Sequence, residues 1–112
     1  MQNRKSASKS ASRRFGRSPI DLRLVVKDKT ATLHGRTKNL GEGGMGATIA
    51  GDIRLGELVE VQFQVPQAAE PLLIRAEVRY RQGFQYGFKF LQPTEEQLEL
   101  IRATVRNLPI EQ

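Results

Sequence analysis

The sequence predicts a mainly β fold, a six-stranded antiparallel barrel followed by one C-terminal α-helix. Apolar residues alternate with polar ones through most of the chain, which is the pattern of strands with one buried face. The period changes to three and four only after Pro93, where a helix is expected. The connections are short and 112 residues make one domain, so the strands should close on themselves with the helix packed against them.

The first half of the predicted barrel consists of extended segments separated by turns. The extended segments are residues 21–27, 30–40 and 45–49, and the turns are residues 28–29, the glycine cluster 41–46 and residues 52–56. In the first segment, DLRLVVK, the apolar residues Leu22, Leu24 and Val26 share one face. We expect the cluster GEGGMG to be a turn with positive φ at some position, because so many glycines do not suit a strand interior.

The second half of the barrel shows the alternation most clearly. The extended segments are residues 57–65, 72–81 and 84–91, with a loop at 66–71 and a tight hairpin at Gln82–Gly83. The alternation predicts two sets of core residues, which are Leu72, Ile74, Ala76, Val78 and Tyr80 on one strand and Phe84, Tyr86, Phe88 and Phe90 on the next. The residues between these aromatics are polar or small, so core packing explains them better than a nucleic-acid-binding face does.

The C-terminal helix is predicted at residues 94–108. Pro93 ends the last strand, Thr94 is the expected N-cap, and Gln97 completes a capping box. An apolar stripe follows at Leu98, Ile101, Val105 and Leu108. Pro109 ends the helix, because proline cannot continue it.

Positive charge is concentrated at the N-terminus. The net charge of +6 resides in the first 20 residues, because residues 21–112 hold 12 basic and 12 acidic side chains. We therefore expect a flexible basic tail at residues 1–12 and a barrel domain at residues 13–112, with the basic segment attracting phosphate groups. The chain has neither an apolar run long enough to span a bilayer nor a signal-peptide core, so we expect a cytoplasmic protein with no transmembrane segment.

The residues needed for enzymatic chemistry are missing. There is no cysteine and only one histidine, His34, so thiolate and histidine metal sites are not expected. The acidic residues are scattered and none is paired with a histidine or cysteine. The glycine cluster lacks the Lys-Ser/Thr that follows a phosphate-binding loop. We expect no enzyme activity, no catalytic residues, no metal and no cofactor.

Two short motifs carry a resemblance to a known family. The first is Arg13-x-x-x-Arg17, directly before the first long strand, and the second is Asn39-x-Gly41-x-x-Gly44, about twenty residues later. In order and spacing, they are similar to the R-x-x-x-R and D/N-x-S-x-x-G motifs of the PilZ domain, a bacterial receptor module for cyclic di-GMP. Residues 86–91, YGFKFL, also resemble the last strand of that family. The resemblance covers residues 12–108 and implies a PilZ-like barrel.

The resemblance implies a ligand-binding site for cyclic di-GMP, a ligand with two phosphodiesters and two guanines. It makes Arg13, Arg14 and Arg17 the clamp, because arginine forks onto phosphate oxygens or guanine and stacks on bases. It makes Asn39 the residue that reads guanine, since its amide both donates and accepts. Gly44 shapes the turn, while Gly41 and Gly43 leave room for the base. Gly41 replaces the family's serine, which removes one hydrogen bond worth about 0.5–1.5 kcal/mol.

Three functions remain open at this point. The first is a cyclic di-GMP receptor that orders its arginine-rich segment over the barrel and acts on a partner, expected to be a protein of motility, biofilm or polysaccharide export. The second is a degenerate PilZ adaptor that binds proteins but not nucleotide. The third is a small barrel that binds RNA or DNA; because residues 21–112 are charge-neutral, no DNA is expected as a partner.

Overall fold

A computed structural model describes residues 16–110 of the chain, so the predicted tail at residues 1–12 lies outside the described range. The strands are β1 (Ser18–Pro19), β2 (Arg23–Lys27), β3 (Thr32–Leu40), β4 (Gly44–Ile49), β5 (Leu58–Phe63), β6 (Leu72–Gln82) and β7 (Gln85–Phe90), and the helix is α2 (Glu95–Val105). Each of the six long strands matches a segment predicted to be extended, to within one residue at either end where it exceeds that segment.

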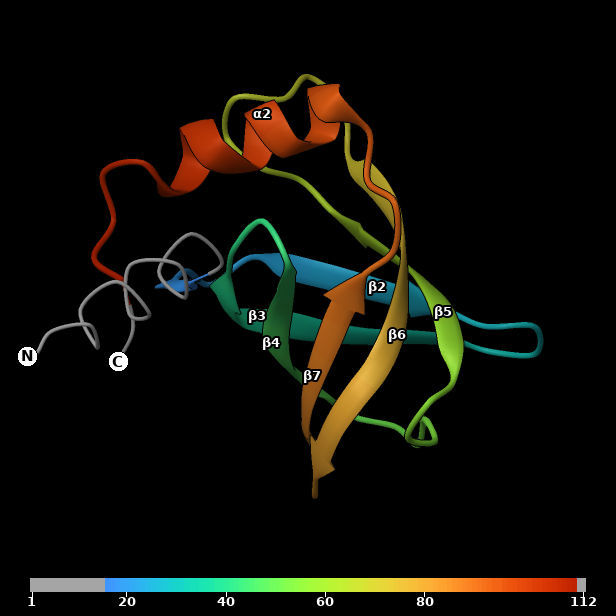
Figure 1. Cartoon of the computed structure of the whole chain (residues 1–112). Helices are drawn as coiled ribbons and strands as arrows, with labels where there is room; N and C mark the ends of the chain where they lie inside the picture. The colour runs from blue at the N-terminus through green and yellow to red at the C-terminus, as the bar shows by residue number, and fades with distance from the viewer. Residues whose placement is uncertain (1–15, 111–112) are drawn as a thin grey trace, which may run out of the picture.

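Six strands form a closed antiparallel barrel, which confirms the predicted fold class (Figure 1). The hydrogen-bonded order is β3, β2, β5, β6, β7 and β4, and β4 pairs back onto β3 to close the sheet. β3 is long enough to pair with β2 through its first half and with β4 through its second half. The two-residue strand β1 pairs with the end of β3 and brings the N-terminal segment onto the barrel.

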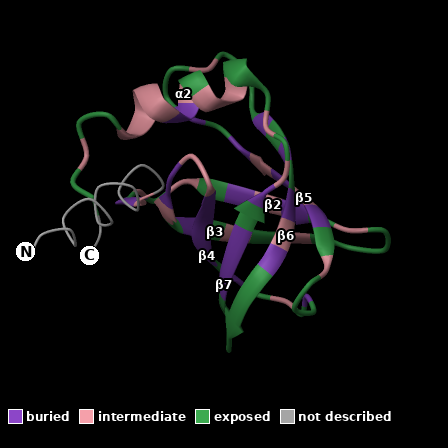
Figure 2. Cartoon of the chain, in the orientation of Figure 1, coloured by how far each residue is buried: buried purple, intermediate pink, exposed green. Residues whose placement is uncertain are grey.

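The core fills the barrel interior and extends to the helix. Inward-facing residues meet across neighbouring strands, as Leu24 does with Phe63 and Val26 with Val61. Tyr86, Phe88 and Phe90 of β7 are buried, as the alternation predicted. Figure 2 shows this burial along the barrel strands, while the far end of the β6–β7 hairpin is exposed.

The helix α2 lies across one end of the barrel (Figure 1). The predicted capping box is confirmed, because the Thr94 hydroxyl accepts from the Gln97 amide at 3.0 Å and the Gln97 side chain accepts from the Thr94 amide at 2.9 Å. Ile101 is completely buried and packs into the core. The helix ends at Val105, so the prediction of 94–108 was one turn too long.

Two predictions about β strands were wrong. Tyr80 and Phe84 are exposed by 51% and 62%, although the alternation placed both in the core. A register shift in β6 turns Tyr80 outward, and Phe84 lies in the hairpin beyond the end of the barrel.

The glycine cluster 41–46 is not a turn throughout, contrary to the prediction, because β4 begins at Gly44. Among the described glycines, only Gly56 and Gly83 have positive φ.

Candidate functional site

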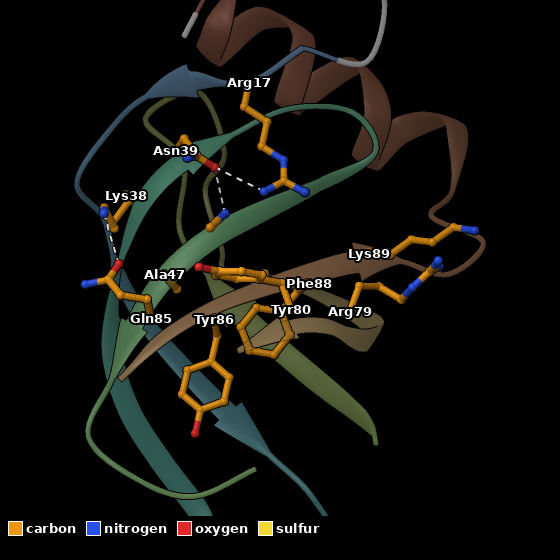
Figure 3. Close-up of a pocket in the computed structure, with 12 residues that line it drawn as sticks. Arg17, Lys38, Asn39, Ala47, Arg79, Tyr80, Gln85, Tyr86, Phe88 and Lys89 are labelled. Atoms are coloured by element: carbon orange, nitrogen blue, oxygen red, sulfur yellow. Dashed lines mark hydrogen bonds between the residues drawn. The ribbon is translucent and has the colours of Figure 1, made fainter. Parts of the chain in front are cut away.

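A pocket of about 250 Å³ lies on the outer surface of the barrel where β3, β4, β7 and β6 run side by side (Figure 3). Its lining consists of Arg17, Lys38, Asn39, Gly46, Ala47, Arg79, Tyr80, Gln85, Tyr86, Gly87, Phe88 and Lys89. Residues from the start of the described chain therefore meet residues from the β6–β7 hairpin. This arrangement depends on barrel closure, since β4 connects β3 to β7.

A β-bulge lies on each side of the pocket. In β3 the register shifts between Thr37 and Asn39, which leaves Lys38 as the extra residue. In β6 it shifts between Val78 and Tyr80, which leaves Arg79 as the extra residue. Bulges break the alternation of side chains between the two faces of a strand and redirect them. Both extra residues are basic and both line the pocket.

Asn39 is held firmly at the upper edge of the pocket. Its side-chain oxygen accepts a hydrogen bond from the amide of Gly46 on β4 at 2.7 Å and a longer one from Arg17 Nη1 at 3.5 Å (Figure 3). Gly46 has to be glycine for this contact, because a Cβ there would lie 2.9 Å from the Asn39 oxygen. The sequence thus fixes the position of the amide through the backbone of the neighbouring strand.

Arg17 is positioned by the short segment that connects it to the barrel. Thr37, which is buried, donates a hydrogen bond from its hydroxyl to the carbonyl of Ile20 at 2.6 Å and accepts one from the amide of Leu22 at 2.8 Å. β1 adds backbone pairing with the end of β3. These contacts bring Arg17 to the pocket from outside the six-stranded barrel.

The lining of the pocket is strongly basic. It contains four cationic side chains, from Arg17, Lys38, Arg79 and Lys89, and no carboxylate from the described part of the chain. Lys38 Nζ donates a hydrogen bond to the side-chain oxygen of Gln85 at 2.9 Å. Arg79 Nη1 lies 3.9 Å from the carboxylate of Glu77, which does not line the pocket. Cations gathered in one concave site attract anions such as phosphate groups.

The glycine turn beside the pocket packs directly against the N-terminal segment. The Gly41 amide donates to the Gly44 carbonyl at 2.9 Å, which closes the turn. A Cβ on Gly41 would overlap the carbonyl oxygen of Gly16 and lie 3.3 Å from Cγ of Arg17. Glycine at position 41 therefore lets the segment that carries Arg17 pack directly on the turn.

The same turn is tied to the C-terminal helix. Arg102 of α2 lies 3.2 Å from the carboxylate of Glu42, and it also contacts Glu95 at 3.1 Å and Glu99 at 3.0 Å. The hydrogen bonds that Arg102 donates to the carboxylates of Glu95 and Glu42 raise the pKa of Arg102 above its ordinary value. The turn thus contacts both the basic segment and α2.

The structure places the predicted site residues in three groups. Arg17 and Asn39 come together in the pocket, whereas Gly41 and Gly43 lie in the turn beside it, Gly44 begins β4, and none of these three glycines lines the pocket. Arg13 and Arg14 lie outside the described residues. The motifs missed Gly46, Gly87 and the polar and aromatic lining residues Lys38, Arg79, Tyr80, Gln85 and Lys89. The alternation of the strand QYGFKF places Gln85, Gly87 and Lys89 on its outer face, and this was the signal in the sequence that could have identified them.

Two other features, metal-binding groups and helices that could cross a membrane, are absent from the residues that the structure describes. No group of three or more histidine, cysteine, aspartate or glutamate side chains within residues 16–110 could hold a metal ion. No helix in that range is long and apolar enough to cross a membrane.

Comparison with protein families gives a match to the PilZ domain over residues 11–107. The chain is a PilZ domain. A search of curated proteins found no match. PilZ domains act as binding modules, and the match covers both sequence motifs and the whole barrel.

Solved structures show the same fold. The PilZ domain with c-di-GMP of YcgR from Escherichia coli superposes with a TM-score of 0.65 at 21% identity, over 83% of this chain and 91% of that one. The PilZ domain of CeSA from a cellulose-synthesizing bacterium gives 0.62 at 18%, over 80% and 95%. The Bacillus subtilis inhibitor of motility, MotI/DgrA, gives 0.69 at 14%, over 82% of this chain but only 49% of that one. This PilZ domain thus spans about half the length of MotI/DgrA.

Proposed function

We propose that this PilZ domain is a receptor for cyclic di-GMP and binds it in the basic pocket between β3 and β6. The observation that carries the proposal is the composition of that pocket, with four cations, one fixed amide and no carboxylate in its described lining. A ligand with two phosphodiesters and two guanines matches such a lining. The YcgR PilZ domain, which shares the fold, was solved with c-di-GMP.

Each residue has a role that its chemistry supports. Arg17 can form two parallel hydrogen bonds to a phosphate or to the O6 and N7 atoms of guanine. Asn39 has an amide nitrogen that can donate to the base while its oxygen keeps the bond from Gly46. Lys38 and Lys89 add positive charge from the two sides. Gly41, Gly43 and Gly44 lie where the chain turns into β4, and Gly41 packs against the segment that carries Arg17.

The N-terminal segment is the element that we expect to respond to the ligand. Arg13 and Arg14 precede Arg17 and complete the basic motif. Binding of the ligand by all three arginines would fix the segment over the barrel, and the ordering would reduce the net affinity. The new surface would then contact a partner, for which a protein of motility, biofilm or polysaccharide export is our proposal.

Isothermal titration with cyclic di-GMP tests the proposal. Arg17→Ala should raise Kd roughly 10- to 150-fold, because a hydrogen bond to a charged group contributes about 1.5–3 kcal/mol. Arg23→Ala is the matched control, since it removes the same charge from β2, outside the pocket, and should leave Kd unchanged. Absence of binding heat from the wild type at tens of micromolar ligand would overturn the proposal.

One observation favours the adaptor as a second candidate function. Gly41 lacks the family's serine hydroxyl, and the Gly16 carbonyl lies beside the turn where that side chain would begin. An adaptor would keep the barrel and its surface but would not bind nucleotide. Capture of the same protein partner with and without cyclic di-GMP, together with a blank titration, would favour this function over the receptor.

A further inference from the structure

We propose that Tyr80 is a stacking platform for a purine ring in the basic pocket, an inference that rests on the proposed function and names the part of the ligand that Tyr80 contacts. Neither sequence motif includes this residue. It lies on β6, at the side of the pocket opposite Asn39. Tyr80 is the last of four residues that form a row across the barrel surface.

The row consists of direct cross-strand partners. Asn39 on β3 pairs with Gly46 on β4, Gly46 pairs with Gly87 on β7, and Gly87 pairs with Tyr80 on β6. Partners opposite each other on neighbouring strands present their side chains on the same face. The row therefore has an amide at one end, a phenol ring at the other, and two glycines between them.

The two glycines make the middle of this row a floor of bare backbone. Glycine within a strand often marks a place where another group approaches the backbone closely. Asn39 and Tyr80 are three strand spacings apart, which is about 14 Å between their Cα atoms. The Asn39 side chain lies against Gly46 and the Tyr80 ring lies on Gly87, so a flat ring can enter between these two side chains, where neither glycine contributes a side chain of its own.

The bulge in β6 is what brings Tyr80 into this row. Val78 pairs with Phe88 and faces the core, and regular alternation would turn Tyr80 to the core as well. The extra residue Arg79 shifts the register by one, so Tyr80 pairs with Gly87 and faces outward. The next residue, Arg81, is reversed too, and its guanidinium lies 5.2 Å from the centre of the ring of Tyr86.

Gly87 also supports the ring of Tyr80. A Cβ at Gly87 would lie 3.0 Å from Cβ of Tyr80 and 3.8 Å from its Cγ and Cδ2, so the aromatic side chain packs directly on the glycine. The Tyr80 hydroxyl donates to the side chain of Gln82 at 2.5 Å, which restrains the ring from its other end. Half of Tyr80 nevertheless remains exposed, at 51%. The ring is therefore held in position and still accessible.

The surroundings of the ring favour a charged, planar ligand over a purely apolar one. Tyr80 is the only exposed large hydrophobic side chain that lines the pocket within the described residues, and the cations Arg79 and Lys89 lie beside it (Figure 3). Aromatic side chains among basic residues are the usual means of holding a nucleobase, with the base on the ring and its phosphate on the cations. Guanine in cyclic di-GMP combines these two features.

The test compares three variants with the wild type in titrations with cyclic di-GMP. Tyr80→Ala should raise Kd between about five- and about 150-fold, the range measured for loss of base stacking. Tyr80→Phe keeps the ring and should restore affinity to within about threefold. Phe84→Ala is the matched control, because Phe84 is an equally exposed aromatic residue outside the pocket, and it should leave Kd unchanged.

A fluorescence measurement separates stacking from a merely structural effect. The chain has no tryptophan, so Tyr80→Trp introduces a single one at the proposed platform. Cyclic di-GMP should change the emission of this tryptophan with the same Kd as the titration, because stacking alters the environment of the ring. Phe84→Trp, the control, should show no change.

The outcomes distinguish the two proposals. Tight binding by the wild type with an unaltered Kd for Tyr80→Ala would overturn the stacking role and leave the receptor function intact. Equal losses for Tyr80→Ala and Tyr80→Phe would also overturn it, since the ring would then not be the contact. No binding by the wild type would overturn both proposals. Thermal unfolding of each variant verifies that the barrel is folded.

Discussion

Gly41 lies in the turn before β4, and the carbonyl oxygen of Gly16 occupies the space where a side chain at position 41 would begin. Replacing Gly41 by serine restores the residue of the family motif, but the new Cβ would overlap that oxygen. The contact is with backbone, so it cannot be relieved by rotating a side chain. We therefore expect Gly41→Ser to displace the segment that carries Arg17.

The size of the effect follows from the packing. Insertion of extra atoms into a filled site costs about 1–3 kcal/mol, which corresponds to a fall in Tm of roughly 4 to 20 °C for a domain of this size. The affinity of Gly41→Ser for cyclic di-GMP should be lower than or equal to that of the wild type. A serine hydroxyl can add about 0.5–1.5 kcal/mol, whereas a displaced Arg17 loses about 1.5–3 kcal/mol at a charged ligand.

Thermal unfolding and titration with cyclic di-GMP measure the two effects. Gly51→Ser is the matched control, because the new Cβ there would meet the methyl groups of Leu33 at 2.8 and 2.9 Å, and that flexible side chain can move. Its loss of stability should stay below about 1 kcal/mol. In a chain that starts at Ser18, the Gly16 carbonyl is absent and Gly41→Ser should no longer be destabilising.

Packing at Gly41 and the family motif lead to opposite expectations for the change in affinity on Gly41→Ser. If serine were merely a missing hydrogen-bonding group, Gly41→Ser would tighten binding up to about tenfold and leave Tm unchanged. A rise in affinity without loss of stability would refute the packing argument. An undiminished loss in the shortened chain would refute the role of the Gly16 carbonyl.

Two further predictions concern the stability of the barrel. Thr37→Val removes a buried hydroxyl that hydrogen bonds to the carbonyl of Ile20 and the amide of Leu22, and leaving both unsatisfied should lower the free energy of unfolding in urea by about 2–4 kcal/mol; an unchanged midpoint would contradict this. Asp28 accepts hydrogen bonds from the backbone amides two and three residues along the chain, which lower its pKa below the ordinary 3.8. The stability that ionised Asp28 contributes is complete above pH 3.8 and is lost as the pH falls through the lowered pKa. Asp28→Asn should therefore reduce the loss of unfolding free energy in acid, and an equal loss in the variant and the wild type would contradict this.

The features that could be predicted from the sequence are those with a local signal. Alternation gave the strands and the change of period gave the helix, because each depends on residues within a few positions of one another. The capping box of Thr94 and Gln97 has the same local character. Closure of the barrel followed from the number of strands and their short connections, and it is confirmed by the pairing of β4 with β3.

The register could not be predicted in the same way. The alternation from Leu72 continues without interruption to Tyr80, so nothing in the sequence marks Arg79 as an extra residue. A bulge depends on how two strands fit over their whole length, and its position is decided by the partner strand. The prediction of positive φ in the glycine cluster was wrong because contacts with neighbouring strands, which the local sequence does not show, require the glycine there. At Gly44 glycine is needed for close approach, since a Cβ would overlap the carbonyl of Phe88.

The candidate site was predictable only where a motif named it. Arg17 and Asn39 belong to the two motifs, and the structure brings them within hydrogen-bonding distance across 22 residues of sequence. Lys38, Arg79 and Lys89 belong to neither of these two motifs and come from three different strands. Their common location depends on cross-strand neighbours, which become known only when the register is known.

The two bulges explain why the outer surface of this barrel contains a pocket. Regular strands would keep a uniform outer face, with a side chain rising from every second residue. Here Lys38 interrupts the alternation on β3 and Arg79 interrupts it on β6, while the two strands between them carry Gly46 and Gly87 at the same level. Side chains thus rise at both sides and are missing in the middle. The hollow is therefore a property of the register of four strands, and substitutions that shift either bulge should alter binding even where every residue of the two motifs is retained.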